Sequence, residues 1–98
     1  GGVCGGANLR PRLYVDLYET AAAGEHDRVA GLHAEVMAIS GSIYQVGRHP
    51  SRYLKGLKCA LSLLGICSDF MAEPFHRFRA EEREQVAAHL RALGLLGE

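Results

Sequence analysis

The sequence predicts a mostly α-helical fold in which one short N-terminal strand is followed by about four or five helices. Residues 1–8 are small apart from one β-branched valine, whereas apolar residues after Pro11 recur at steps of three and four. A single strand cannot form a sheet, because its backbone donors and acceptors need neighbouring strands. The sequence therefore predicts that these neighbours lie outside the 98 residues and that the chain is the tail of a longer protein.

The first two predicted helices occupy the N-terminal half. One begins at Pro11, since proline is favoured at the first helical position, and Asn8 stands before it as a possible cap. It ends near Ala23, where Gly24 supplies a C-terminal glycine. The second spans residues 25–44, and its apolar stripe consists of Val29, Leu32, Val36, Ile39 and Ile43.

Two more helices are predicted in the C-terminal half. Residues 47–51 break the helical pattern, and Ser51 is expected to cap a third helix that continues to about Leu64. An irregular segment with a central proline follows at residues 67–78. The fourth helix is predicted at residues 79–93, with a glycine after it.

Composition excludes several classes of partner. Eleven basic residues balance eleven acidic ones, so no net field favours nucleic acid or an anionic membrane. No apolar run approaches the ~18 residues that cross a bilayer. Cys4, Cys59 and Cys67 form an odd set without paired spacing, which indicates reduced thiols and a cytoplasmic location. The histidines show no metal-ligand spacing, so no metal site is expected.

Several motifs follow one another in an order that points to a known family. Residues 1–8 read Gly-Gly-Val-Cys-Gly-Gly-Ala-Asn, residues 21–24 read Ala-Ala-Ala-Gly, and a helix with Lys-Cys-Ala runs from 58 to Gly65. A late proline at position 74 and Gly-Leu-Leu at residues 94–96 complete the series. Together they resemble the C-terminal part of the dihydrodipicolinate synthase and N-acetylneuraminate lyase family, whose eighth strand is similar to residues 1–8.

The resemblance implies a fragment of an α/β (β/α)8 barrel from a Schiff-base-forming class I aldolase. Residues 1–24 would be the last strand and helix of the barrel, and residues 25–98 a C-terminal helical extension. The family's Schiff-base lysine lies on strand six, upstream of this chain, together with its proton-relaying tyrosine and paired threonines. No catalytic residue is therefore expected here, and Lys55 and Lys58 are interpreted as solvated or salt-bridging side chains.

The resemblance also implies partners. The full-length parent would act on pyruvate or a related 2-keto acid, use no metal or organic cofactor, and form a homo-oligomer, either a tetramer or a dimer. The reaction of the parent protein stays open among dihydrodipicolinate synthesis, N-acetylneuraminate cleavage and sugar-acid aldol reactions. These 98 residues alone are expected to be inactive, because the lysine that forms the electrophile is missing.

Candidate substrate-binding residues lie in the opening segment. Active sites of such barrels gather at the C-terminal ends of strands, and small residues let the backbone approach a ligand closely. By resemblance, the Val3 carbonyl would face the Schiff-base lysine, and Cys4, Gly5 and Gly6 would line the pocket wall. The alternative is that Gly5 and Gly6 only permit tight packing of a helix on the strand.

Two other interpretations stay open from the residues alone. Four amphipathic segments are enough for a stand-alone helical bundle that acts as a protein-interaction module. The chain is also compatible with a natural partial gene product that associates with a complementary fragment. A bundle should melt cooperatively as a monomer, whereas a barrel tail should expose apolar faces and associate.

Overall fold

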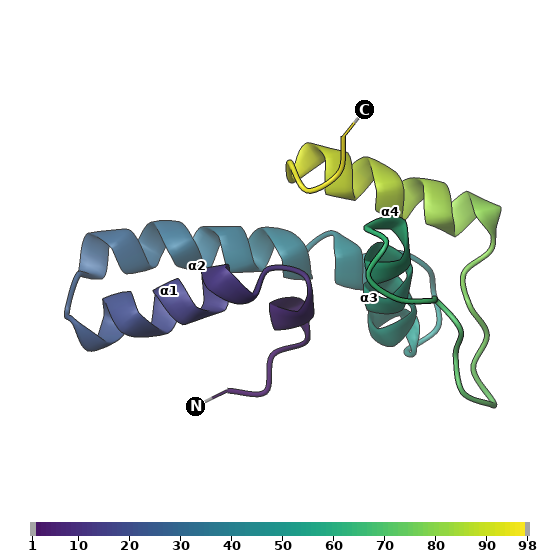
Figure 1. Ribbon diagram of the computed structural model, residues 1–98, viewed down its shortest axis with the longest axis horizontal. Helices are drawn as coiled ribbons and strands as arrows, with labels where there is room; N and C mark the ends of the chain where they lie inside the picture. Colours follow the sequence, from purple (N-terminus) through teal and green to yellow (C-terminus); the bar gives the residue numbers. More distant parts are fainter. Residues whose placement is uncertain (1, 98) are drawn as a thin grey trace.

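The computed structural model describes residues 2–97, which fold into a helical hairpin followed by a pair of crossing helices (Figure 1). The first two α-helices lie side by side and antiparallel, the third stands across the end of this hairpin, and the fourth packs on the third. The elements are η1 (Gly5–Asn8), α1 (Pro11–Ala22), α2 (His26–Ser40), η2 (Ile43–Gln45), α3 (Arg52–Leu63) and α4 (Ala80–Ala92), where η denotes a 3-10 helix. The mostly helical prediction is thus confirmed.

The predicted N-terminal strand is wrong. Cys4 has extended backbone angles (φ −112°, ψ 116°), but no strand lies beside it anywhere in residues 2–97. The chain turns at once into η1, where the Ala7 N–H donates to the Cys4 carbonyl at 3.1 Å. An extended segment becomes a strand only when a neighbour satisfies its backbone groups. Gly1, the first residue of the predicted strand, lies outside the described residues, as does Glu98.

Glycines end three of the helices as the sequence predicted. Gly24, Gly65 and Gly94 follow α1, α3 and α4 with φ of 75°, 76° and 75°, a left-handed conformation that glycine adopts without a steric penalty. The next residue then donates its N–H back to the helix, for example from Leu95 to the Leu90 carbonyl at 2.9 Å.

Three local predictions need correction. The second helix ends at Ser40 rather than near residue 44, and the Ser42 hydroxyl donates to the Ala38 carbonyl at 2.6 Å, which competes with continued helix. Asn8 does not cap α1, because its side-chain amide donates to the Gly5 carbonyl at 3.0 Å and closes η1 instead. Ser51 precedes α3, but its hydroxyl makes no cap and bonds to the ring of His49 at 2.7 Å.

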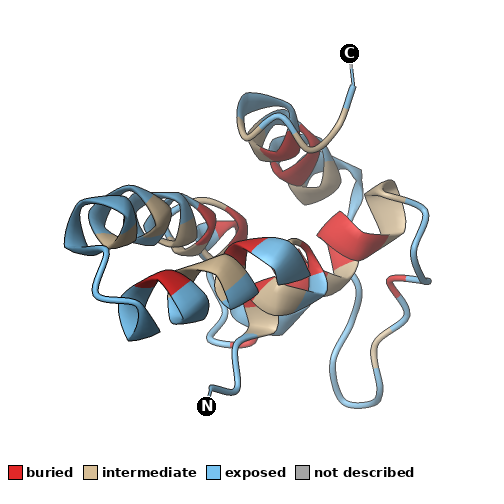
Figure 2. Ribbon diagram, turned by 60° about the vertical axis from the view of Figure 1, so that its left-hand side comes forward, coloured by how far each residue is buried: buried red, intermediate tan, exposed pale blue. Residues whose placement is uncertain are grey.

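The core lies where the end of α2, η2, α3 and α4 meet, which is where buried residues gather in Figure 2. Gly56 brings α3 directly against the η2 backbone, because a Cβ added there would overlap the carbonyl oxygen of Ile43. The largest fully buried side chains are Ile39, Ile43, Leu90, Val86 and Cys59.

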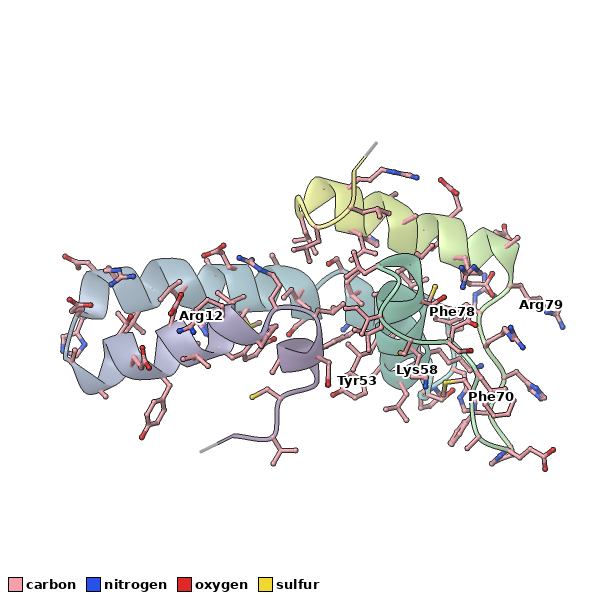
Figure 3. The ribbon with its side chains drawn as sticks, in the orientation of Figure 1. Arg12, Tyr53, Lys58, Phe70, Phe78 and Arg79 are labelled. Carbon is pink, nitrogen blue, oxygen red and sulfur yellow. The ribbon has the colours of Figure 1, made fainter. Side chains whose placement is uncertain are left out.

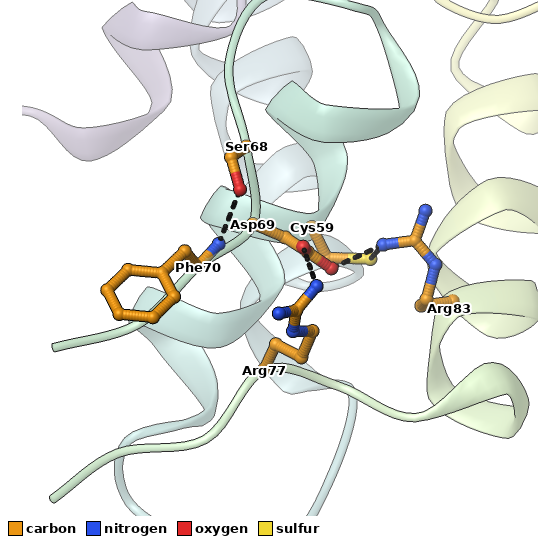
Figure 4. A network of polar contacts seen from close by, with 6 residues as sticks. All are labelled: Cys59, Ser68, Asp69, Phe70, Arg77 and Arg83. Atoms are coloured by element: carbon orange, nitrogen blue, oxygen red, sulfur yellow. Dashed lines mark hydrogen bonds and ion pairs between the residues drawn. The ribbon is translucent and has the colours of Figure 1, made fainter. Parts of the chain in front are cut away.

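An ionic network holds the irregular segment between α3 and α4 (Figure 4). The buried Asp69 carboxylate pairs with Arg83 of α4 at 2.5 Å and with Arg77 at 3.4 Å. Arg83 also approaches the Cys59 sulfur at 3.9 Å. Near this network, Phe78 is buried and anchors the end of the segment. These contacts hold the two ends of residues 69–79, which contain no regular secondary structure.

The overall dimensions are large for the chain length. The radius of gyration is 14.2 Å, whereas a compact domain of this length has about 12.6 Å. The accessible surface of 6346 Å² likewise exceeds the roughly 5500 Å² expected for a folded monomer of this mass. Much of the excess lies on the α1–α2 hairpin, whose residues are mostly exposed (Figure 2).

Candidate functional site

The four predicted pocket-wall residues are consecutive but differ in exposure, because two precede the η1 turn and two begin it. Val3 and Cys4 are exposed, Gly5 is half-buried and Gly6 is buried at the start of η1. The Gly6 carbonyl accepts from the N–H groups of Leu9 and Arg10, both at 3.0 Å, which locks the turn. Within residues 2–97 the backbone of Val3 makes no hydrogen bond.

Three tyrosines from separate elements enclose this turn. Tyr14 comes from α1, Tyr44 from η2 and Tyr53 from α3, and Figure 3 shows Tyr53 directly beside η1. A Cβ added to Gly5 would lie 2.8 Å from Cζ of Tyr53. One added to Gly6 would lie 2.7 Å from Cζ of Tyr14 and 2.9 Å from the Tyr44 hydroxyl. The glycines are therefore needed for close packing, although against tyrosines rather than against a strand.

The hydroxyls of Tyr14 and Tyr44 form a protonated pair. Burial raises the pKa of Tyr44 to about 12, and the neighbouring Tyr14 adds to the shift. Burial also raises the pKa of Tyr14, while its hydrogen bond with Tyr44 opposes the increase. The Gly6 N–H donates to the Tyr44 hydroxyl, and the Tyr44 and Tyr53 rings pack edge to face with centroids 4.6 Å apart. At neutral pH Tyr14 and Tyr44 therefore supply neutral hydrogen bonds that position the turn.

Sequence reasoning missed this cluster. Tyr14 and Tyr18 are four residues apart on α1, which favours a contact between them, but Tyr18 is 67% exposed and Tyr14 pairs with Tyr44 instead. In the sequence, the only indication of the cluster is the pair Gly5 and Gly6 in a chain with four tyrosines. That pattern does not tell which tyrosines approach the glycines.

An apolar groove of about 660 Å³ runs from the turn along α1. Its lining includes Cys4, Pro11 and Tyr14 next to the turn, and Val15 and Tyr18 further along the helix. Val15 is 41% exposed, so the groove leaves a row of apolar side chains in water. Such a row is typical of a surface that another protein segment covers.

The other candidate groups do not join this site. Lys55 and Lys58 are half-buried on α3, and neither lines the groove. His49 is exposed and accepts from the Ser51 N–H at 3.0 Å, so its Nδ1 is occupied within the loop. Among residues 2–97, no group of three or more metal-ligating side chains is present, and every helix is too short or too polar to span a bilayer.

Gly6→Ala is expected to destabilise the turn more than Gly5→Ala. At position 6 the methyl group meets two half-buried, hydrogen-bonded tyrosines, and overpacking of this kind costs about 1–3 kcal/mol. At position 5 it meets Tyr53, which is 37% exposed and has room to turn outward. Urea denaturation of both variants measures the difference. Equal losses of unfolding free energy would contradict the proposed tyrosine packing.

The chain is expected to lose stability at alkaline pH. Burial raises the pKa of Cys59 from 9.0 to about 11, and that of Tyr44 from 10.0 to about 12. Both groups therefore lose protons first in the unfolded chain, so their contribution is complete below about pH 9 and declines up to about pH 12. Denaturation midpoints measured across this range should fall less steeply in a Cys59→Ala, Tyr44→Phe double variant. An unchanged pH dependence in that variant would assign the loss to other groups.

Comparison with known proteins places this architecture. Residues 1–93 match the Dihydrodipicolinate synthetase family. The chain is 29% identical over 93 residues to the 4-hydroxy-tetrahydrodipicolinate synthase of Methanopyrus kandleri. This match covers 94% of the chain and 29% of that protein. The chain is 29% identical over 92 residues to the synthase of the same name from Bartonella bacilliformis, of which it covers 30%.

A solved structure agrees with the sequence matches. The dihydrodipicolinate synthase from the commensal bacterium Bacteroides thetaiotaomicron is 55% identical to this chain, with a TM-score of 0.91 over 94% of the chain. The match covers 31% of that structure, so the chain spans less than a third of the proteins that it resembles. The chain belongs to the Dihydrodipicolinate synthetase family and corresponds to its C-terminal part.

Proposed function

We propose that the protein to which this chain belongs is a pyruvate-dependent, Schiff-base-forming lyase that acts as a cytoplasmic homo-oligomer. The proposal rests chiefly on the 55% identity to a structure named dihydrodipicolinate synthase. In this chemistry a lysine amine attacks the ketone of pyruvate, the ketone oxygen leaves as water, and the resulting iminium withdraws electrons. Deprotonation gives an enamine, which adds to an aldehyde or an imine. The lysine belongs to the part of the barrel upstream of these residues.

This chain contributes the end of the barrel rather than the reacting groups. Residues 1–24 supply the end of the barrel, where an extended segment leads into η1 and α1, and residues 25–98 form the helical extension. Val3, Cys4, Gly5 and Gly6 line the pocket, with the Val3 carbonyl toward the Schiff-base lysine. The backbone of Val3, which makes no hydrogen bond within residues 2–97, is available for a neighbouring strand. The tyrosine cluster holds the turn that follows.

The apolar groove on α1 is the surface that the rest of the barrel covers. It begins at the turn that follows the extended segment, and it exposes Val15 and Tyr18. The large radius of gyration supports the same conclusion, because a chain that is completed by other segments need not be compact by itself. Alone, the chain is expected to be inactive, since the attacking lysine is absent.

Fragment complementation tests this function. The Bacteroides thetaiotaomicron synthase, truncated to remove the segment that matches this chain, is mixed with the 98-residue chain and assayed for synthase activity. Activity is expected to return, and borohydride should trap labelled pyruvate on the truncated barrel only. Val15→Asp in the groove should prevent rescue, whereas Ala34→Asp on the exposed surface of α2 should not.

Two outcomes would contradict the proposal. Pyruvate trapped on the 98-residue chain itself would show that this segment carries its own nucleophile. A chain that melts cooperatively as a monomer and never binds the truncated barrel would favour the stand-alone interaction module.

A further inference from the structure

A second cavity, of about 250 Å³, lies at the other end of the molecule from the apolar groove. It is formed by the loop before α3, the first turns of α3 and the segment that leads into α4. None of its lining residues belongs to the tyrosine cluster or to the groove. Its lining is unusually basic and includes Arg48, Arg52, Lys55, Arg77 and Arg79, against a single carboxylate from Glu82.

This clustering concentrates positive charge in one place on a chain whose net charge is zero. Five basic side chains and one acidic side chain give the cavity a formal charge of +4 with His49 and His76 neutral, whereas the whole chain sums to zero. Among the basic residues of the cavity, only Arg77 has an ion-pair partner within residues 2–97, and that partner is Asp69. Like charges held together repel one another, so an anion bound among them relieves an existing repulsion.

The basic groups stand on backbone that is already fixed. Arg52 donates to the Gln45 side-chain oxygen at 2.7 Å and to the Gly47 carbonyl at 3.4 Å, two neutral partners that orient its guanidinium without neutralising it. Phe78, the residue between Arg77 and Arg79 in the sequence, is buried and anchors the second side of the cavity. Arg79 extends from the start of α4 in Figure 3. The backbone around the cavity and the Arg52 guanidinium are therefore in place before any ligand arrives.

We propose that this cavity binds the phosphate group of a small metabolite. A phosphate ester carries about −1.5 to −2 charges and three terminal oxygens in a compact group. Arginine forks bind such oxygens in pairs, and lysine adds a point charge. The volume of the cavity accommodates a phosphate with a short carbon chain. A carboxylate has fewer oxygens and less charge, so it matches the three cations Arg48, Lys55 and Arg79 less well.

Calorimetric titration of the 98-residue chain tests the proposal with two probes. Inorganic phosphate tests the group alone, and glycerol 3-phosphate tests a phosphate ester with a short carbon chain. We expect saturable binding of the ester with a dissociation constant of about 1 mM or lower. Binding should weaken as salt is raised, because the groups are partly exposed. Tighter binding of phosphate than of the ester would identify the free ion as the ligand and would still support the site.

Two lysines on one helix give a matched control. Lys55 lines the cavity and Lys58, one turn along α3, does not. Lys55→Gln is expected to weaken binding about fivefold, whereas Lys58→Gln should leave it unchanged, with far-UV circular dichroism confirming that both remain helical. An Arg48→Gln, Arg79→Gln double variant should weaken it by at least about tenfold.

Three results would overturn the proposal. The first is the absence of saturable binding of either probe at about 10 mM, far above the expected dissociation constant. The second is an equal loss in Lys55→Gln and Lys58→Gln, which would indicate unspecific attraction. The third is tighter binding of citrate or of a single-stranded oligonucleotide than of the phosphate ester, which would assign the cavity to a different class of anion.

Discussion

Gly56→Ala is expected to lower the free energy of unfolding by about 3 kcal/mol, the upper end of what overpacking usually costs. The added methyl group overlaps the Ile43 carbonyl oxygen and lies 3.3 Å from its carbon. Both atoms belong to the backbone of η2, so no side-chain rotation relieves the contact. Small domains are stable by only about 5–15 kcal/mol, so a large fraction of the variant should unfold at moderate urea concentrations.

Gly31→Ala provides the matched control. Gly31 is also helical, but it lies on the exposed side of α2 with nothing within 4 Å of an added Cβ. Alanine there should stabilise the chain by about 0.5–1 kcal/mol, because glycine loses more backbone freedom on folding. Urea denaturation of the two variants compares the same chemical change in two environments. If both shift the midpoint in the same direction, the close contact between α3 and η2 is incorrect.

Leu90→Ala is expected to destabilise the chain by about 2–5 kcal/mol. Leu90 is fully buried in α4, where its side chain joins the core cluster that contains α3 residues, so truncation leaves a cavity at the contact between the two helices. Leu54→Ala on α3 is the control, since Leu54 is 44% exposed and its loss should cost far less. Hydrogen exchange should locate the damage in the amides of α3 and α4. Comparable losses in both variants would mean that α4 is not docked as described.

Local periodicity predicted most of the fold. The four helices were found because their apolar residues recur at helical spacing and because glycines follow three of them. Residues 1–8 were misassigned because a strand depends on neighbours, which no local pattern supplies. Ser51 was misassigned as a helix cap because its hydroxyl hydrogen-bonds to the imidazole ring of His49 and not to a backbone N–H of α3. Such competition depends on side-chain placement in three dimensions.

The two sites differ in how far the sequence could reveal them. The sequence of residues 1–8 resembles the family's eighth strand, so it indicated where this segment lies in the family's fold. It did not indicate that the segment forms a 3-10 turn. The tyrosines around it are 39 residues apart at their extremes, from Tyr14 to Tyr53, and only the fold brings them together. The basic cavity joins residues 48–55 to residues 76–79 in the same way, and a balanced overall charge concealed it.

The different exposure of the three thiols allows the separation of α4 from α3 to be measured by chemical labelling. Cys4 and Cys67 are exposed, whereas Cys59 of α3 is fully buried beside the ionic network. An alkylating reagent should therefore consume two thiols quickly and reach the third only when α4 separates from α3. The rate of that slow reaction, followed by mass spectrometry, measures how often the interior is exposed to water. Labelling of all three at one rate would indicate that this interior is already open.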